Sequence, residues 1–542
     1  MTSDIESLVE HCYDSDPKYT EIQAGVPEDY KEIKTLGDLL SVNYKLLSSQ
    51  QQIRKNLILF KNQEKLPYPG IIGFDDDVLP ALDRALLSGH DIFLIGQIGQ
   101  AKTKLVQTIA ENLLSPIPII KNSITNDCPI ELPKNDLISI LTDEEWENKD
   151  PIFHISPESI EILREKKLET PISWKKGKHR YKYVLATPDI SVKDLVGYID
   201  AIKVAKKGVE MYKIDSYSPG QLMQAKHGIF CIDELPVLDP RKQVSLLSVL
   251  QEGRFTTGAY PVIFEPKTMF FATANPIDYT HSGKVIEPLF DRLKSHIHTH
   301  YPKTTEDEMM IILQEAKLPK SVVSSFLLKA LATFIQKMRQ SEQINQERGV
   351  SVRLGIHGLE ILVGEAERTR ALAHKIIPVP RLSDFHSLEQ IVKFELSELD
   401  DTIENRKKIF NELINESIKE ISLVMLEGTD ENTLQSIKEE FGEKTFPVSQ
   451  FMIWKNGQMS YSNQIEQFSH LKNLLEQKLK DLDNLNNAFL EKISPLGIDS
   501  KTLQYEDGFE EIRSFLIEVL LEGLCWVKPK VLDKRESGYG SA

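Results

Sequence analysis

A short apolar segment at residues 91–95 runs directly into a glycine-containing turn, which is followed by an amphipathic stretch at residues 103–114. An apolar run of this length predicts a buried strand, and the spacing of apolar residues after the turn predicts a helix. Similar apolar runs occur at residues 183–185, 228–232 and 268–273, with helical patterns between them. Continuous apolar strands separated by helices predict an α/β fold, in which helices cover both faces of a parallel sheet.

Four regions of different character divide the 542 residues. Residues 1–67 are polar with leucines at roughly helical spacing, so we expect a helical N-terminal extension. We expect the α/β core at residues 68–302, with an insertion near 123–226. Strand signals fade after that point, which predicts a helical domain at 303–375 and an acidic, helical C-terminal extension at 376–542.

Two apolar stretches stand out in the C-terminal region. A stripe of apolar residues from Ile465 to Phe489 fits either a short coiled coil or an ordinary helix packed on its neighbours. The ordinary helix is favoured because the heptads are so few. Residues 515–527 are too short and too charged, with Glu518 and Glu522, to span a bilayer, so they predict a packed amphipathic helix.

Net charge and cysteine content limit the kinds of partner, metal site and cellular setting that we expect for this chain. The chain has 81 acidic and 65 basic residues, a formal net charge of −16. This acidity argues against nucleic acid and membrane as partners, although local basic patches could exist. The four cysteines lack C-x-x-C spacing, so neither a zinc site nor a disulfide framework is indicated. An acidic N-terminus is wrong for a signal peptide, and a cytoplasmic setting fits best.

The turn after the first strand reads Gly96-Gln-Ile-Gly-Gln-Ala-Lys-Thr103 and differs from G-x-x-x-x-G-K-[ST] only at Ala101. Its place between a strand and a helix suits a phosphate-binding loop, whose backbone N–H groups face the phosphates. Lys102 would reach the β- and γ-phosphates, and Thr103 would bind Mg²⁺. The alternative is a glycine turn with an incidental lysine. The candidate nucleotide-binding residues in this segment are Gly96, Gly99, Gln100, Ala101, Lys102, Thr103 and Leu105.

An acidic pair, Asp233 and Glu234, closes a later apolar strand, and Asn275 closes the next one. Asp233 would hold Mg²⁺ directly or through water, while Glu234 would polarise the attacking water and Asn275 would orient it. A strand that ends in Asp-Glu can equally be a solvated strand end. The order of the motifs favours a nucleotide site. The phosphate-binding loop, the acidic pair and Asn275 are followed by Arg292 and then Arg353, each at the edge of a predicted element.

Residues 68–375 resemble the AAA+ ATPases of the MoxR and magnesium-chelatase I-subunit group. The resemblance rests on a loop of the form G-x-x-G-x-A-K-T, on Gly73-Phe-Asp75 with Ala81-Leu-Asp-Arg-Ala85, on Leu250-Gln-Glu-Gly-Arg254 and on Asp291-Arg292. It implies an AAA+ core with a helical lid, ATP and Mg²⁺ as cofactors, and a homo-hexameric ring. By the same resemblance, Arg292 is an arginine finger for the ATP of the adjacent subunit, and Arg353 is a second sensor in the lid.

Parts of the insertion, at residues 123–129, 186–200 and 217–228, look like the chelatase I-subunit. Residues 376–542 match neither branch of this group, so three possible functions of the chain stay open. The favoured one is a MoxR-like ATPase that remodels or matures a partner complex, whose partner carries a von Willebrand factor A-type domain. The second is a chelatase motor that drives Mg insertion into a porphyrin. The third is a non-catalytic ATP-binding scaffold, against which the intact acidic pair argues.

Two further clusters have ordinary explanations. His296, His298 and His300 alternate along a predicted strand and would share one face. No carboxylate or cysteine has a matching spacing, so we expect a surface or interdomain strand rather than a metal site. The basic, aromatic stretch 174–183 could touch nucleic acid, but a solvated hairpin or a contact for an acidic partner is favoured.

Overall fold

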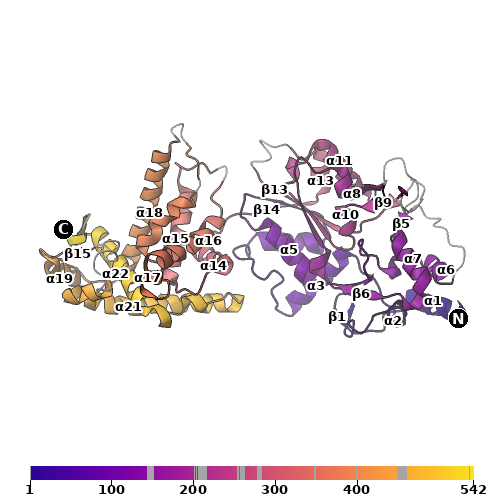
Figure 1. Ribbon diagram of the computed structural model, residues 1–542, viewed down its shortest axis with the longest axis horizontal. Coiled ribbons are helices and arrows are strands. Elements are labelled where there is room, and N and C mark those ends of the chain that lie inside the picture. The colour runs from indigo at the N-terminus through magenta and orange to yellow at the C-terminus, as the bar shows by residue number, and fades with distance from the viewer. Residues whose placement is uncertain are drawn as a thin grey trace. The chain divides into compact units, whose positions relative to one another are not determined.

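The computed structural model describes residues 2–142, 152–200, 202, 204–205, 217–252, 255–256, 263–276, 284–346, 349–392, 394–397, 401–447, 461–535 and 538–542. The chain divides into two compact units, Met1–His300 and Tyr301–Ala542. In Figure 1 the first unit is coloured from indigo to pink and the second from orange to yellow. Each unit is described by itself below.

A five-stranded sheet lies at the centre of the first unit, in the order β14-β3-β13-β10-β7. Every neighbouring pair in this sheet is parallel. The three inner strands are buried along nearly their whole length, as an apolar run covered on both faces requires. The α/β prediction is therefore confirmed. The strands are β3 (Ile92–Ile95), β7 (Tyr181–Leu185), β10 (Ile229–Asp233), β13 (Met269–Ala274) and β14 (Ser295–His298).

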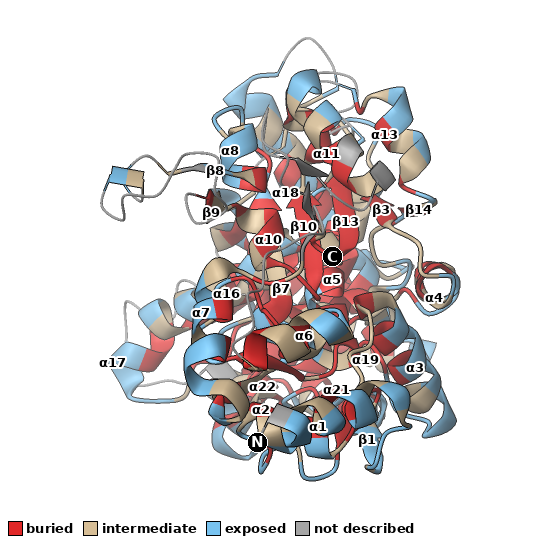
Figure 2. Cartoon of the chain, turned by 90° about the vertical axis from the view of Figure 1, so that its right-hand side faces the viewer, coloured by how far each residue is buried: buried red, intermediate tan, exposed pale blue. Residues whose placement is uncertain are grey.

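Helices cover both faces of this sheet, and alternate strand residues point to opposite layers. Ile92, Leu94 and Phe271 pack into one core with α3 (Ser49–Asn62), α4 (Val78–Leu87) and α5 (Lys102–Leu113). Phe93 and Phe270 pack into the other core, against α8 (Val192–Val196), α10 (Gln221–Gln224), α11 (Pro240–Glu252) and α13 (Glu287–Arg292). Figure 2 shows the buried sheet between the partly exposed helices.

The N-terminal segment and part of the predicted insertion form a further core. Apolar residues of α1 (Thr2–Asp14) and α2 (Leu36–Ser41) pack with those of α6 (Lys134–Leu141) and α7 (Pro157–Lys166). The antiparallel pair of β4 (Ile117–Ile120) and β6 (Ile172–Lys175) borders this core. The remaining short strands are β1 (Glu21–Gln23), β2 (Val26–Pro27), β5 (Ile152–Phe153), β8 (Gly197–Ile199), β9 (Tyr217–Pro219), β11 (Phe255–Thr256) and β12 (Ile263–Phe264).

The second unit is mainly helical. The helix α15 (Ser325–Gln340) packs against helices from both the predicted lid and the predicted C-terminal extension. These neighbours are α14 (Thr305–Glu315), α16 (Arg353–Ala366), α18 (Ile403–Leu426) and α21 (Ser469–Ile493). The described part of the unit also contains α17 (Leu372–His374), α19 (Glu431–Phe441) and α22 (Phe509–Trp526). A small antiparallel sheet joins β15 (Phe446–Pro447), β17 (Gly538–Ser541) and β16 (Leu532–Arg535).

Two C-terminal predictions can be compared with these helices. The apolar stripe from Leu471 to Phe489 lies on α21, and its first residues, Ile465 and Phe468, precede that helix. The helix packs on its neighbours α19, α22 and α15, as the ordinary-helix interpretation expects. The prediction of a packed helix at 515–527 agrees with α22, but its amphipathic character is wrong, because the helix is buried on nearly all sides and Glu518 is itself buried. No helix among the described residues is both long enough and apolar enough to cross a membrane.

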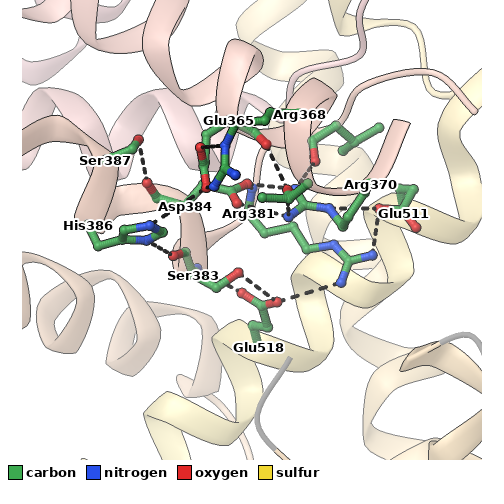
Figure 3. A network of polar contacts seen from close by, with 12 residues as sticks. Glu365, Arg368, Arg370, Arg381, Ser383, Asp384, His386, Ser387, Glu511 and Glu518 are labelled. Atoms are coloured by element: carbon green, nitrogen blue, oxygen red, sulfur yellow. Dashed lines mark hydrogen bonds and ion pairs between the residues drawn. The ribbon is translucent and has the colours of Figure 1, made fainter. Parts of the chain in front are cut away.

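A buried network of charges explains how Glu518 is accommodated (Figure 3). Its carboxylate accepts hydrogen bonds from the backbone N–H and the hydroxyl of Ser383, at 3.0 and 3.2 Å. Arg381 pairs with Glu511 at 2.5 Å, and Arg370 pairs with Asp384 at 2.6 Å. The network ties the segment after the predicted lid to α22, so charged groups reinforce the apolar packing of this unit.

Candidate nucleotide-binding site

The turn between β3 and α5 is closely packed against the end of β14. The side-chain oxygen of Gln100 accepts hydrogen bonds from the N–H of Gln97, at 3.0 Å, and from the hydroxyl of Thr299, at 2.8 Å. A Cβ atom on Gly96 would lie 2.0 Å from that hydroxyl oxygen and 2.2 Å from the Gln100 oxygen. Glycine is therefore required at 96 by the close approach of two side chains, and the Gln100 side chain braces the loop.

Ala101 has a left-handed backbone, with φ 52° and ψ 16°, at the first turn of α5. The usual glycine of the phosphate-loop pattern adopts such a conformation without strain, whereas alanine does so at a cost of about 1–2 kcal/mol. The departure from the strict pattern thus keeps the loop geometry and adds strain. The Nζ atom of Lys102 donates to the carbonyl oxygens of Gly96 and Gln97, the latter at 2.9 Å, so the ammonium group lies against the loop backbone.

Thr103 and Asp233 meet at the carboxyl edge of the sheet. The Thr103 hydroxyl lies 3.3 Å from Asp233 Oδ2, although 130 residues separate them. The same oxygen accepts a hydrogen bond of 2.7 Å from the hydroxyl of Tyr183, while Asp233 Oδ1 accepts one from the hydroxyl of Thr273. Burial and the bond to Asp233 raise the pKa of Tyr183. Three hydroxyl groups therefore fix the orientation of one carboxylate.

Glu234 and Asn275 follow adjacent strands, β10 and β13, so both lie at this same edge. Glu234 has a left-handed backbone, with φ 57° and ψ 45°, and its N–H donates to the hydroxyl of Thr273 at 3.1 Å. Asn275 is buried and follows Ala274, which pairs with the last residue of β3. The fold thus gathers the loop, the acidic pair and the asparagine at one edge of the sheet.

Arg292 lies at the amino ends of the strands, whereas the loop and the acidic pair lie at their carboxyl ends. It ends α13 three residues before Ser295, which pairs with Ile92 at the amino end of β3. Its Nε atom donates to the carbonyl oxygen of Leu250 at 2.8 Å. Burial raises the pKa of the nearby Asp91, and Lys294 and Arg292 oppose this shift. A four-residue strand, about 13 Å long, therefore separates Arg292 from the loop of its own chain.

The last two candidate nucleotide-binding residues lie elsewhere. Leu105 is fully buried among the apolar side chains beneath the sheet, which is a packing position. A nucleotide contact through Leu105 stays a prediction. Arg353 belongs to the second unit, where it is the exposed first residue of α16 and its N–H donates to the hydroxyl of Ser351 at 3.2 Å. Its part in nucleotide binding also stays a prediction.

The histidines of β14 and the basic stretch 174–183 can now be placed in the structure. His296 and His298 are exposed, and His300 pairs with Asp77 at 3.0 Å. The described residues include no group of three or more His, Cys, Asp or Glu side chains that could hold a metal ion. Within the basic stretch, Arg180 is buried and donates to Gln52 and to a backbone carbonyl, and Trp174 donates to another. The expectation of a solvated hairpin is wrong, because Arg180 is buried and β6 and β7 pair with β4 and β10 rather than with each other. A contact for an acidic partner stays a prediction.

Sequence reasoning missed Tyr183 and Thr273, which both contact Asp233. A polar residue within the apolar run 268–273 was a usable signal for Thr273, because an inward hydroxyl in a buried strand needs a partner. Tyr183 gave no such signal. Its contact depends on β7 and β10 being neighbours in the sheet, which the sequence does not state.

Part of the first unit matches a known family of protein domains. Residues 170–293 match the AAA domain (dynein-related subfamily), a stretch that includes the acidic pair, Asn275 and Arg292. The uncharacterized protein YeaC of Bacillus subtilis (strain 168) is 24% identical over 219 residues, which are 37% of this chain and 64% of that protein. The chain thus spans less than two thirds of that relative.

Two solved structures align at low similarity. The BchI–BchD complex of magnesium chelatase has 20% identity and a TM-score of 0.31, over 46% of this chain and 65% of that chain. NtrX from Brucella abortus in complex with ATP has 12% identity and a TM-score of 0.32, over 77% of this chain and 72% of that chain. The AAA-domain match covers β7, β10 and β13, the strands that the sheet places on one side of β3 and its loop, so this part of the first unit is similar to an AAA domain.

Proposed function

We propose that the first unit binds and hydrolyses Mg-ATP and that the chain uses this reaction to remodel a partner protein complex. The observation that carries the first part is the 3.3 Å approach of the Thr103 hydroxyl to the Asp233 carboxylate. One group comes from the phosphate-binding loop and the other from the acidic pair. Hydroxyl and carboxylate oxygens are the ligand types that Mg²⁺ prefers, so this donor set fits the ion.

The loop residues would carry the charge of the phosphates. Mg²⁺, when bound, would neutralise charge on the β- and γ-phosphate oxygens. Lys102 would exchange the carbonyl oxygens of Gly96 and Gln97 for phosphate oxygens, which bear more negative charge. The backbone N–H groups at the start of α5 would add the positive end of a helix. Positioning and charge stabilisation of this kind account for most of the catalysis of phosphoryl transfer.

Glu234 and Asn275 are the candidates for handling the attacking water. The Glu234 backbone is held by Thr273 in a left-handed conformation, which costs about 1–3 kcal/mol and is typical of functional positions. Asn275 lies at the end of the neighbouring strand. A carboxylate and an amide at one strand edge can together accept a proton from a water molecule and orient it.

The position of Arg292 supports a ring. It lies about 13 Å along the strand from its own loop, which supports the proposal that its guanidinium group would serve the site of another subunit. In a head-to-tail ring, every subunit can present this arginine to the next one. We therefore propose a homo-hexameric assembly in which Arg292 completes the neighbouring site. The four cysteines are free and buried, which fits the cytoplasmic setting that the sequence predicts.

The hydrolytic part of the proposal is tested with Glu234→Gln. This variant should bind ATP with wild-type affinity, measured with a fluorescent analogue, and should turn it over at least about 100-fold more slowly. Glu287→Gln is the matched control, because Glu287 is an exposed carboxylate in the first turn of α13. Undiminished hydrolysis by Glu234→Gln would remove Glu234 from the proposed mechanism.

The remodelling part rests on the resemblance to MoxR-like ATPases and is tested by trapping. Glu234→Gln with ATP should hold the ring in its ATP-bound state and retain the partner, for which we propose a protein with a von Willebrand factor A-type domain. Lys102→Ala, which should not bind ATP, is the control bait. A protein recovered equally with both baits would not be the partner that ATP recruits.

A further inference from the structure

The side chain of Tyr183, on β7, extends along the sheet to the carboxylate of Asp233 on the neighbouring strand β10. The offset between the two residues in the strand pairing matches the length of a tyrosine side chain. Tyr183 pairs with Cys231 and Leu185 pairs with Asp233, so the tyrosine starts two residues behind the carboxylate. Two residues of strand span about 6.6 Å, which is close to the length of a tyrosine side chain. The hydroxyl donates to Asp233 Oδ2 at 2.7 Å. Phenylalanine at this position would keep the ring and lose only the donor.

The three hydroxyl groups hold the carboxylate from both sides of β10. Thr273 lies on β13 and binds Oδ1, whereas Tyr183 lies on β7 and binds Oδ2, beside the hydroxyl of Thr103. A carboxylate has about four acceptor positions, so one stays available for a metal ion or its water. Without Tyr183, the oxygen that faces Thr103 would lose its restraint on the β7 side.

The exposure of Tyr183 argues that its hydroxyl does little for folding. The side chain is 40% exposed, and the bond joins two groups at the rim of the sheet. A hydrogen bond in such a position adds little net stability, because water can replace it. The main effect of this hydrogen bond is to orient the carboxylate of Asp233.

We propose that Tyr183 is a positioning residue that orients Asp233 toward Thr103 and thereby sets the affinity of the nucleotide site for Mg²⁺. This inference rests on the proposed function, because it assigns the Thr103–Asp233 pair to the metal. Groups that hydrogen-bond to a metal ligand commonly change metal affinity or activity by about 10–100-fold when they are removed.

The test compares Tyr183→Phe with Tyr181→Phe. Tyr181 lies two residues earlier on the same face of β7, and its ring is beside Cys231 rather than bonded to Asp233. Binding of a fluorescent ATP analogue is titrated with Mg²⁺ and repeated in EDTA. Tyr183→Phe should need about 10-fold more Mg²⁺ for half-maximal binding and for half-maximal hydrolysis. Affinity in EDTA and melting temperature should match those of wild type, and Tyr181→Phe should behave as wild type in the Mg²⁺ titration.

The outcomes separate the two proposals. If Tyr183→Phe has the Mg²⁺ dependence of wild type while Asp233→Asn loses Mg²⁺-dependent binding, the positioning role is wrong and the proposed function stands. If Tyr183→Phe binds more weakly in EDTA as well, or melts earlier, its role is structural and the inference also fails. If Asp233→Asn keeps Mg²⁺-dependent binding and hydrolysis, the proposed function itself is wrong.

Discussion

The hydroxyl of Thr103 lies 3.3 Å from the carboxylate of Asp233, which joins the first turn of α5 to the end of β10. We expect Thr103→Ala to lower Mg²⁺-dependent ATP hydrolysis by about 100-fold, because a metal ligand is lost. Thr103→Ser keeps the hydroxyl and should retain most of the activity. Steady-state hydrolysis over a range of Mg²⁺ concentrations measures both. Equal activity of the alanine and serine variants would show that this hydroxyl has no part in the reaction.

The elements around this pair could be predicted because each is marked by local sequence. The inner strands are apolar runs, and the predicted 91–95, 228–232 and 268–273 differ from the observed strands by about one residue at each end. Polar residues at the ends of parallel strands then had to meet at one edge. The small C-terminal sheet was missed, because strands of two to four residues leave too short a pattern.

Other features depend on relationships that a single sequence does not contain. The contact of Tyr183 with Asp233 needs the order of β7 and β10, and the distance of Arg292 from its own loop needs the length and direction of β14. Burial of Glu518 depends on contacts with Ser383 and Arg381, which lie more than 100 positions away. Long-range packing of this kind overrides the local pattern, which by itself predicted an amphipathic surface for α22.

Ala101→Gly should stabilise the first unit. Glycine removes the strain of the left-handed backbone at 101, and its greater freedom in the unfolded chain offsets part of that gain, which leaves about 0.5–1 kcal/mol. Ala110→Gly makes the same change at a buried helical position of α5 and should destabilise by about 1 kcal/mol. Differential scanning calorimetry of the full chain would show shifts of opposite sign. A lower melting temperature for Ala101→Gly would contradict the strain at this residue.

The variants Arg292→Ala and Lys102→Ala should each lack ATP hydrolysis when tested alone. Rings that contain both variants should regain part of it. Loss of an arginine finger lowers the rate by about 10³–10⁵-fold. In randomly mixed rings, about a quarter of the interfaces would join an intact loop to an intact Arg292. The mixture should therefore recover about a quarter of wild-type activity. A mixture no more active than its separate components, in rings shown to contain both variants, would exclude action across the interface.

Lys226→Met should destabilise the first unit most strongly at neutral pH. Lys226 is buried and pairs with Asp127 at 3.2 Å and Glu131 at 2.7 Å. Burial alone would raise the pKa of Glu131, but Lys226 and His227 outweigh it and hold that pKa well below its usual range. A lowered carboxylate pKa contributes stability that is fully present above the unfolded pKa, about 4.3, and is lost as the pH falls through the folded pKa.

Without Lys226, both carboxylates would be buried without their main counter-charge, at a cost of about 3–5 kcal/mol at pH 7. Protonation relieves that cost, so the difference in melting temperature between wild type and Lys226→Met should narrow between pH 7 and pH 4.5. Lys134→Met is the control, because Lys134 pairs with the exposed Asp14 and should have a small effect at both pH values. A difference that stays constant with pH would contradict the role of these carboxylates.

Arg381→Met should destabilise the second unit far more than the loss of an exposed ion pair does. Arg381 is buried, pairs with Glu511 at 2.5 Å and lies 3.7 Å from Glu518. Its removal leaves two carboxylates of α22, those of Glu511 and Glu518, with less compensating charge, which should cost about 3–5 kcal/mol. Lys320→Met is the matched control, because Lys320 is 79% exposed where it pairs with Asp507, and its loss should cost less than about 1 kcal/mol. Thermal unfolding of the full-length variants compares the two. If both variants melt within a degree of each other, packing alone holds α22 and the charge network is dispensable.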